Sequence, residues 1–391
     1  MSPLQRGTAA KRQGVSFDMT VFYVLAIAAV IQGIISLRDG VRAARYMRTF
    51  RPRAGSHAQV IVFCPCKGVD REFEKNIHSV LDQDYTNYEV KFVVESEDDE
   101  ACRTLRELGI IDVLIAGRAS DCGQKVHNLT YAVKHAGAAA DVYVFCDSDA
   151  RFDRQWLSKL TAPLAASMVT TGYRWYLAER FHIPTLLRSV WNASVVSMLG
   201  DHNRNFAWGG SMAMRRATFE DLRILEAWRG SVSDDYAITR ASKQAGAKII
   251  FVPECLVPSH GECTWQELLE FTTRQITITR VYHPRLWRAA FAAQIIFSAA
   301  FLGLPFTLPA LWLVVYLLSA AKAWVRIGAV RSVLPDTALS SFGWFYILCS
   351  PLAALLYLYN MVRSALGTDI VWRQIHYKLI SPNETRVLGG W

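Results

Sequence analysis

The sequence predicts an α/β domain with a mostly parallel, Rossmann-like sheet, joined to membrane-spanning helices at both ends. Two patterns lead to this prediction. Apolar runs alternate with short helical segments over residues 57–288, and long uncharged runs lie on either side of that region. Hydrophobic residues make up 52% and charged residues only 20% of the 391 positions, a balance that excludes disordered, collagen-like and coiled-coil chains.

Residues 19–37 are predicted to form one membrane-spanning helix, preceded by an N-terminal tail over residues 1–18. The run contains no charge and is just long enough to cross a bilayer. A signal peptide is the alternative interpretation. It is disfavoured because arginines follow the run where a small-residue cleavage site would be expected.

The next segment, residues 38–56, is predicted to be a basic linker beside the membrane. Its arginines are Arg38, Arg42, Arg45, Arg48, Arg51 and Arg53, whereas Arg6, Lys11 and Arg12 precede the apolar run. The more basic flank of a membrane helix stays in the cytoplasm. We therefore expect an integral protein of the cell inner membrane, or an equivalent membrane, with a cytoplasmic α/β domain.

Within residues 57–288, strands and helices are expected to alternate as βαβ units. The predicted strands cover 58–65, 89–96, 112–117 and 141–147, and the predicted helices cover 71–82, 98–108 and 125–135. Such units form a mostly parallel sheet whose ligands bind beyond the carboxyl ends of the strands. Two acidic clusters, at 95–100 and 147–149, follow predicted strands in this way.

Residues 289–362 are predicted to form a C-terminal membrane region of two or three helices, followed by a tail over residues 363–391. Gly303, Pro305 and Pro309 interrupt the first uncharged stretch, so we expect a helical hairpin there. If residues 337–362 also cross the membrane, the basic tail lies outside, against the positive-inside rule. The alternatives are an interfacial last segment or a single crossing by residues 289–321.

The net charge of +9 does not indicate a nucleic-acid partner. The basic excess comes largely from residues 38–53, and no basic motif with interleaved aromatic residues occurs. The eight cysteines form no CxxC pair, so a zinc site is not predicted, and most of them lie in apolar runs. A reducing cytosolic setting is the simpler interpretation of these cysteines.

The sharpest chemical motif is CDSDA, in which Asp147 and Asp149 directly follow an apolar strand. Two carboxylates at the end of a strand can converge on a hard divalent cation, Mg²⁺ or Mn²⁺, which often shares its oxygen ligands with a diphosphate. The alternative is a polar turn that caps the next helix. The position at the carboxyl end of a strand favours the metal site.

Two further acidic clusters have structural and functional interpretations. The acids at 95–100 either occupy the first turn of a helix or include one that binds a ribose or a base edge. In SVSDDYAITR, Asp234 and Asp235 open an apparent helix. One of them is a candidate N-cap, and the other a candidate general base for a hydroxyl nucleophile.

Together these motifs resemble the GT-A glycosyltransferases of family 2, and more closely the ceramide glucosyltransferase branch, family 21. CPCKGVD (64–70) is similar to the Pro-x-Lys-Gly-Val-Asp opening of that branch. ESEDDEA, GQKVHNL (123–129), CDSDA, WGGSMAMRR (208–216) and SDDY follow in the family's order. The resemblance covers residues 57 to about 285 and includes the membrane layout.

The resemblance implies a role for each matching residue. Asp99 would contact the nucleotide, Lys67 and Lys125 would lie near the nucleotide or diphosphate, Asp147 and Asp149 would hold a metal-bound diphosphate, and Asp235 would be the catalytic base. Of these, Lys125 on a helix is otherwise typical of a solvated charge.

The family's last motif, Gln-or-Arg-x-x-Arg-Trp, is only partly present. Arg274 fits its first position, where it would help to hold the diphosphate, but Thr277 and Ile278 stand where Arg and Trp are expected. Arg280 and Tyr282 are candidate substitutes on the same helix. The tail stretch VWRQIHYKL (371–379) resembles a Trp-Arg-x-x-x-Tyr ending of bacterial members, or else forms an interfacial helix.

These observations predict a membrane-bound, inverting glycosyltransferase. The resemblance implies transfer of glucose or N-acetylglucosamine from a UDP-sugar to a lipid hydroxyl, such as that of ceramide or a hopanoid. The alternatives are a processive polysaccharide synthase and a non-catalytic membrane protein that binds sugar nucleotides. Residues 181–200 form either an interfacial helix that guides the acceptor or a core helix of the α/β domain.

Overall fold

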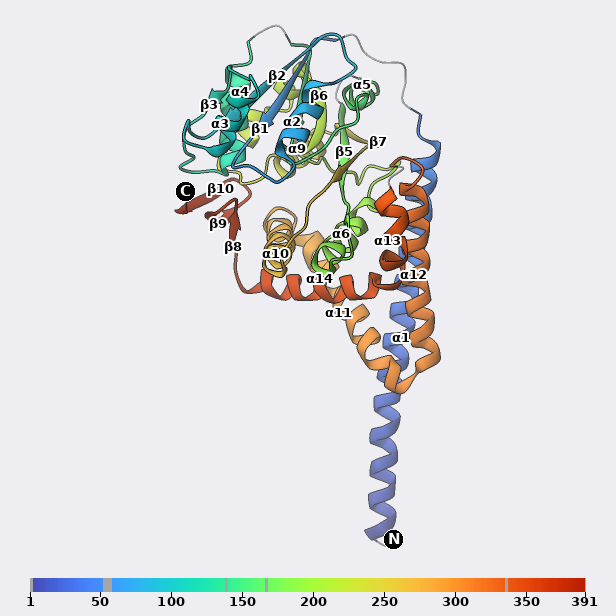
Figure 1. Ribbon diagram of the computed structural model, residues 1–391. Coiled ribbons are helices and arrows are strands. Elements are labelled where there is room, and N and C mark those ends of the chain that lie inside the picture. The colour runs from blue at the N-terminus through green and yellow to red at the C-terminus, as the bar shows by residue number, and fades with distance from the viewer. Residues whose placement is uncertain (1–2, 52–57, 138–139, 166–167, 335–336, 391) are drawn as a thin grey trace.

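The computed structural model describes residues 3–51, 58–137, 140–165, 168–334 and 337–390. An α/β domain lies at one end of a group of long helices, and the N-terminal helix extends away from it (Figure 1). A small sheet built from the C-terminal tail lies beside the α/β domain.

A seven-stranded sheet forms the centre of the α/β domain, with the order β3-β2-β1-β4-β6-β5-β7. Its strands are β1 (Val60–Pro65), β2 (Tyr88–Val94), β3 (Leu114–Ile115), β4 (Val142–Cys146), β5 (Met168–Tyr176), β6 (Ser211–Arg215) and β7 (Lys248–Ser259). Only β6 runs antiparallel to its neighbours. The predicted α/β class with a mostly parallel sheet is therefore confirmed.

Alternate residues of β1 face two different cores, as the two-residue repeat of a strand requires. Val60, Val62 and Cys64 pack with α2 (Phe73–Leu81), α3 (Glu100–Glu107) and α5 (Trp156–Thr161). Ile61 and Phe63 pack with α4 (Gln124–Lys134), α7 (Arg216–Asp221), α8 (Ile224–Ala227) and α9 (Asp234–Gln244). Helices on both faces explain why the sequences of β1 and β4 are almost entirely apolar.

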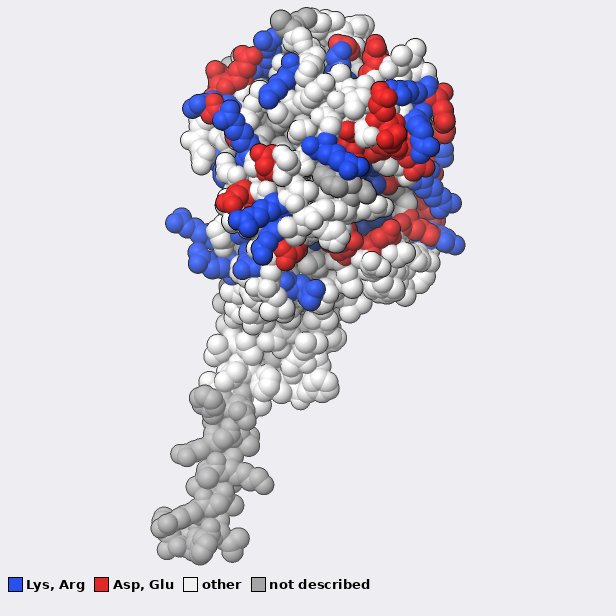
Figure 2. Space-filling model, turned by 90° about the vertical axis from the view of Figure 1, so that its left-hand side faces the viewer, with Lys and Arg blue, Asp and Glu red and all other residues white. Residues whose placement is uncertain are grey.

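Three helices of the described chain are long and apolar enough to span a membrane: residues Met19–Thr49 of α1 (Pro3–Thr49), α11 (Pro284–Thr307) and α12 (Pro309–Val330). The break between α11 and α12 falls at Leu308, directly before Pro309. On the face shown in Figure 2, charged side chains gather over the α/β domain and leave the tapering region below it uncharged.

Helix α1 differs from the prediction of a short span between a tail and a linker, because it is continuous from Pro3 to Thr49. Its last turns dock on the α/β domain, where Ala43, Ala44 and Met47 are buried. The Tyr46 hydroxyl donates a hydrogen bond of 2.7 Å to the carbonyl oxygen of Phe251 in β7. Packing thus keeps the basic segment helical up to Thr49; residues 52–57 lie outside the described chain.

Three helices form a layer between the α/β domain and the spanning helices, here called the platform: α6 (Ile183–Val196), α10 (Trp265–Tyr282) and α14 (Ser350–Leu366). The buried amide of Asn360 in α14 joins all three. It donates hydrogen bonds to the hydroxyls of Thr272 and Thr273 in α10 and accepts one from Trp191 in α6. Helix α14 is bent by 68° from α13 (Thr337–Leu348).

The C-terminal tail forms a three-stranded antiparallel sheet, here called the tail sheet, from β8 (Asp369–Trp372), β9 (Ile375–Ser381) and β10 (Glu384–Gly389). The interfacial-helix interpretation of residues 371–379 is therefore wrong. Ile375, Tyr377 and Leu379 are buried and alternate with exposed residues, which is the repeat of a strand that has one buried face.

The tail sheet is attached to the α/β domain. The Thr385 hydroxyl donates to the Gly230 carbonyl at 2.8 Å, and the backbone N–H of Gln124 donates to the Tyr377 hydroxyl at 3.1 Å. The tail and the α/β domain thus lie on the same side of the membrane. The chain between them must then cross an even number of times. If α11 and α12 each cross the membrane, they supply two crossings, and the bent pair α13–α14 is then expected not to cross.

This arrangement predicts the side of the membrane on which the tail lies. A reporter fused after Arg53 and one fused after Gly390 should report the same compartment, because the hairpin α11–α12 returns the chain to the side of the α/β domain. The measurement compares green fluorescent protein with alkaline phosphatase at both positions. Opposite compartments for the two fusions would show that α13–α14 is a further span.

Candidate active site

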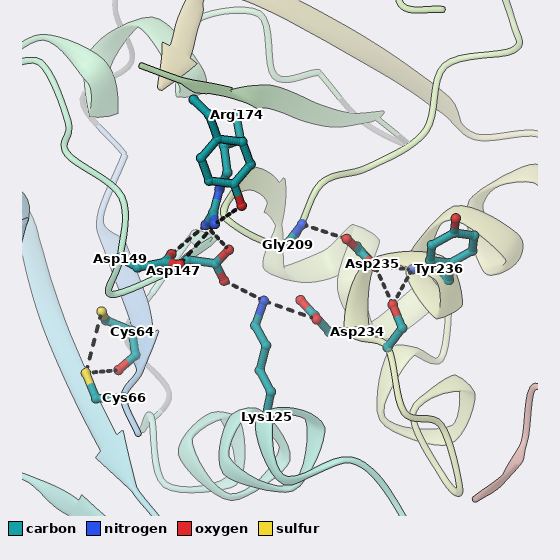
Figure 3. Close-up of polar contacts among 12 residues, drawn as sticks. Cys64, Cys66, Lys125, Asp147, Asp149, Arg174, Gly209, Asp234, Asp235 and Tyr236 are labelled. Carbon is teal, nitrogen blue, oxygen red and sulfur yellow. Dashed lines mark hydrogen bonds and ion pairs between the residues drawn. The ribbon is translucent and has the colours of Figure 1, made fainter. Parts of the chain in front are cut away.

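The two aspartates of the CDSDA motif lie in the loop that follows β4, where they are held by two cations (Figure 3). Lys125, in the first turn of α4, contacts Asp147 Oδ1 at 2.7 Å. Arg174 of β5 contacts Asp147 Oδ2 at 2.9 Å and both carboxylate oxygens of Asp149, at 2.5 and 2.9 Å. The loop therefore presents both carboxylates to one point.

Arg174 is a site residue that the sequence analysis missed. Its side chain is 11% exposed, and its guanidinium lies over the rings of Tyr176 and Trp208, at 5.4 and 5.2 Å from their centres. Burial opposes its charge, but Asp149 raises the pKa of Arg174 above its usual range. In the sequence, the only indication of this role is that Arg174 is the single charged residue of the strand MVTTGYRWY.

The same ion pair acts on Asp149. Burial would raise the pKa of this carboxyl, but the guanidinium groups of Arg174 and Arg373 lower it to about 2. Asp149 is therefore an anion at any physiological pH, which is the form that binds a cation.

The donor set fits a divalent cation completed by substrate oxygens. A single nitrogen, Nη2 of Arg174, touches Asp147 Oδ2 and Asp149 Oδ1, so both carboxylates can reach one cation. Carboxylate oxygens suit Mg²⁺ and Mn²⁺, and Mg²⁺ commonly takes only one or two carboxylates together with phosphate and water. In the described part of the chain, no group of three or more His, Cys, Asp or Glu side chains could hold a metal by itself.

Asp234 is a buried partner of Lys125. Lys125 Nζ lies 3.2 Å from Asp234 Oδ1, and this carboxylate is 2% exposed. Burial raises the pKa of Asp234 to about 7, with Lys125 acting in the opposite direction. Gly209 packs against this pair, because a Cβ atom there would lie 2.2 Å from Asp234 Oδ2 and 2.7 Å from Lys125 Nζ.

Asp235 is less buried than Asp234 and is fixed by three hydrogen bonds. Its Oδ2 accepts a hydrogen bond of 3.2 Å from the Gly209 N–H, and its Oδ1 accepts from the Tyr236 N–H at 2.7 Å and from the Ser233 hydroxyl. The N-cap of α9 is Ser233, so the expectation that one of the two aspartates caps this helix is wrong. The Ser233 hydroxyl shares the Tyr236 N–H with Asp235 Oδ1, which leaves Asp234 to pair with Lys125.

Lys67 and Asp99 form a second group at the ends of β1 and β2. Lys67 Nζ lies 2.5 Å from the largely buried Glu95 carboxylate. Asp99 caps α3 by accepting from the Ala101 N–H at 2.9 Å, and it also accepts from the Gly68 N–H at 2.8 Å. Asp99 is thus the N-cap of α3 and Glu100 lies in its first turn, and the Asp99 carboxylate also fixes the loop that carries Lys67.

Arg274 lies where α10 meets the tail sheet. Its Nη1 donates to the Val371 carbonyl at 3.0 Å, and its guanidinium lies 5.4 Å from the centre of the Trp372 ring. Burial lowers the pKa of Arg274 to about 10. The two residues that depart from the family motif are buried, Thr277 against the backbone of its own helix and Ile278 in a core with the tail sheet.

The suggested substitutes on α10 do not reach the site. Arg280 donates to the Ser364 carbonyl oxygen of α14 and lies over the Trp287 ring. The Tyr282 hydroxyl pairs with the Ser231 hydroxyl at 2.6 Å and accepts from the Val232 N–H. The helical repeat turns Arg280 toward the platform and Tyr282 toward the loop that precedes Asp234, so the expectation that they replace Arg and Trp is wrong.

Comparison with known proteins shows the family of the chain. The model of the family described as "Glycosyl transferase family 21" matches residues 21–385. A mannosyltransferase from Pyrobaculum calidifontis in complex with GDP-Man and Mn²⁺ is similar over 86% of this chain and 99% of its own, at 17% identity and a TM-score of 0.47.

Two further solved structures are similar over 57% of this chain. Glucosyl-3-phosphoglycerate synthase from Mycobacterium tuberculosis, solved with Mn²⁺ and UDP-glucose, is 16% identical, with 79% of its chain covered and a TM-score of 0.38. GalNAc-T7, solved with UDP, GalNAc and Mn²⁺, is 13% identical, with a TM-score of 0.39. This chain spans about half of the GalNAc-T7 chain, with 48% covered.

Because Asp147 and Asp234 share the charge of Lys125, this lysine is expected to contribute to the stability of the protein. Replacing Lys125 with Met leaves Asp147 and Asp234 without the charge that they share, and a broken buried ion pair typically costs about 3–5 kcal/mol. We expect a lower midpoint of thermal unfolding in detergent. Because burial already raises the pKa of Asp234, the loss should be larger near pH 8, where its carboxyl is charged, than near pH 6.

The exposed Lys134 of the same helix provides the control, since Lys134→Met removes a charge without uncovering a buried partner. Adding Asp234→Asn to Lys125→Met should recover part of the loss. An unchanged midpoint for Lys125→Met, or a further fall in the double variant, would contradict this account of the cluster.

Proposed function

We propose that this chain, which belongs to glycosyltransferase family 21, transfers a hexosyl group from a UDP-sugar to a hydroxyl group of a membrane lipid. Its α/β domain has the GT-A-like fold of such enzymes, with a mostly parallel sheet covered by helices. We propose, in addition, the identity of the sugar, the acceptor and the metal ion, and the cytoplasmic orientation of the α/β domain.

The observation that carries the proposal is that one strand connects the carboxylate site to the platform. Arg174 of β5 binds Asp147 and Asp149, and two residues later the Tyr176 ring contacts Phe271 of α10 and Arg188 of α6. In addition, the Asn192 amide of α6 donates to the Arg174 carbonyl at 2.8 Å. The site therefore lies close to the platform helices, where a lipid head group would arrive.

The edge of the platform has the composition of a membrane interface. Phe181 and Trp344 stack on each other with ring centres 6.3 Å apart and are 55% and 50% exposed. Ile183 and Met198, near the two ends of α6, are also largely exposed, while the opposite face of this helix is buried. Exposed aromatic and aliphatic side chains at this level favour contact with lipid over water.

Asp147 and Asp149 would hold the divalent cation, Mg²⁺ or Mn²⁺, together with the donor diphosphate. Such an ion neutralises, as a Lewis acid, the negative charge that develops on the leaving diphosphate. Lys125 keeps Asp147 in place from the other side. Arg174, which now pairs with both carboxylates, is a second cation available to the same diphosphate.

Asp235 would act as the general base. Three hydrogen bonds from Gly209, Ser233 and Tyr236 orient its carboxylate, which is less buried than that of Asp234. As the acceptor oxygen forms a bond to the anomeric carbon, its proton passes to Asp235. The bond from that carbon to the diphosphate oxygen breaks, and the electron pair leaves with UDP. Attack opposite the leaving group inverts the anomeric configuration.

The family resemblance supports glucose or N-acetylglucosamine as the sugar, and ceramide or a hopanoid-type lipid as the acceptor. UDP-sugars are cytoplasmic metabolites, and the arginines that follow residue 37 favour a cytoplasmic α/β domain.

The metal assignment predicts how UDP binding responds to chelation. With Mn²⁺ present, the wild-type protein should bind UDP at least about tenfold more tightly than with EDTA, because the ion neutralises diphosphate charge. The double variant Asp147→Asn, Asp149→Asn should lose that difference, as measured by isothermal titration calorimetry. Asp153→Asn, at an exposed carboxylate nearby, should retain it. Equal UDP affinity with Mn²⁺ and with EDTA in the wild type would refute the assignment.

The base assignment predicts that Asp235→Asn separates turnover from donor binding. The amide keeps the shape of the side chain but accepts no proton, so turnover should fall by about 10²–10⁴-fold. UDP affinity should stay within a factor of a few, because the diphosphate is held by other residues. The two quantities are measured on the same preparation. Near-normal turnover would remove Asp235 from the chemistry, and lost UDP affinity would move it to the donor site.

A further inference from the structure

The turn between β8 and β9 has an unusual backbone. Arg373 and Gln374 form this two-residue hairpin turn with φ angles of 50° and 69°, and in the described chain Arg223 is the one other non-glycine residue with positive φ. A hairpin turn with φ > 0 at both positions favours Gly, Asn or Asp. An arginine here costs conformational energy, and residues held in such conformations cluster at functional sites.

Arg373 joins the tail sheet to the loop that follows β1. Its two terminal nitrogens contact the two oxygens of Asp70 at 2.9 and 2.5 Å, in a bidentate ion pair between residues 303 positions apart. Asp70 ends the CPCKGVD segment, which also carries Lys67. The segment that holds Asp70 also contacts the loop that follows β4, because Arg151 of that loop pairs with Glu72 at 2.5 Å. The Arg373 guanidinium is thus close to the loops that follow β1 and β4, on which the proposed donor residues lie.

Trp372, on the other side of the same turn, contacts the one residue of the family's last motif that is present. Its ring lies 5.4 Å from the guanidinium of Arg274, which also donates to the Val371 carbonyl. The Arg274 side chain is 12% exposed, and its nearest carboxylate, Glu270, is 3.4 Å away. Its Nε atom is buried without a hydrogen-bond partner among the described residues. Arg274 can therefore donate a further hydrogen bond and pair with an additional anion.

Three guanidinium groups act on one another in this region. Burial, together with Arg373 and Arg174, lowers the pKa of Arg274 to about 10, whereas, despite burial, Asp70 raises the pKa of Arg373 above its usual range. Arg373 and Arg174 already face paired carboxylate oxygens, of Asp70 and Asp149, so an anion with paired oxygens fits these guanidinium groups. Guanidinium groups bind phosphate oxygens in a bidentate manner, as Arg373 now binds the oxygens of Asp70. A diphosphate bound at Asp147 and Asp149 would be such an anion.

We propose that the tail sheet supplies the arginine and tryptophan that α10 lacks at Thr277 and Ile278: Arg373 binds the donor diphosphate, and Trp372 holds Arg274 beside it. This inference rests on the proposed function, because it takes a nucleoside diphosphate sugar as the donor. Asp70 holds Arg373 near the site and exchanges it for the diphosphate when the donor binds. The tail sheet is then a part of the donor site that lies beyond the membrane helices in the sequence.

The test compares UDP with uridine, which carries no phosphate. Wild-type protein, Arg373→Gln and Arg373→Lys are titrated with both ligands in the presence of Mn²⁺ by isothermal titration calorimetry. Loss of a hydrogen-bonded charge contact should weaken UDP binding by about 10–100-fold in Arg373→Gln. Arg373→Lys, which keeps the charge but not the bidentate fork, should lose less. Uridine binding should not change in either variant.

The control is Arg386→Gln, which removes an exposed arginine from β10 of the same sheet and should bind UDP like the wild type. Thermal unfolding of each variant reports whether the tail sheet remains folded, and Arg373→Lys tests the proposal if Arg373→Gln unfolds. Unchanged UDP affinity in folded Arg373 variants, or an equal loss for UDP and uridine, would overturn the role of Arg373 alone. A wild-type protein that does not bind UDP would overturn the proposed donor and this inference with it.

Discussion

The site depends on the compensation of acidic charge at one edge of the sheet. Asp147 and Asp149, which are partly buried, meet the fully buried Asp234 there, which is costly unless cations accompany them. Lys125 and Arg174 supply that charge, from α4 and from β5. The glycines at 209 and 210 follow from the same crowding, because a Cβ atom at Gly210 would lie 2.6 Å from Asp147 Oδ2. A cluster of this kind is held ready for a cation and for a phosphate group.

The proposed lipid acceptor implies a second constraint, which is that the site must be held at a fixed position relative to the apolar helices. The structure meets it with short polar connections inside an apolar layer. Asn360 joins the three platform helices through side-chain hydrogen bonds, and the Tyr46 hydroxyl ties α1 to β7. Because β5 passes from Arg174 directly to the platform, a displacement of the membrane helices would be transmitted to the carboxylate loop.

The parts of the fold that arise from local patterns could be predicted from the sequence. The first four strands, the helical hairpin broken near Pro309 and the carboxylates at 147 and 149 each have a signal within a short window. Long-range packing determines the rest. Arg174 acquires its role by facing a loop from a different strand, and the 303 positions between Asp70 and Arg373 leave no trace in either segment. The alternation in IHYKL was a readable strand signal, but its basic and aromatic residues also suit a membrane interface.

The most direct test of the central claim is transfer of a labelled sugar into the lipid fraction. Purified protein in vesicles that contain a lipid extract would be supplied with Mn²⁺ and a panel of radiolabelled UDP-sugars, and the organic phase would be analysed by chromatography and mass spectrometry. We predict that UDP-glucose or UDP-N-acetylglucosamine yields a labelled lipid with the inverted anomeric configuration. Label found only in free sugar or in a water-soluble polymer, with none in lipid, would contradict the account.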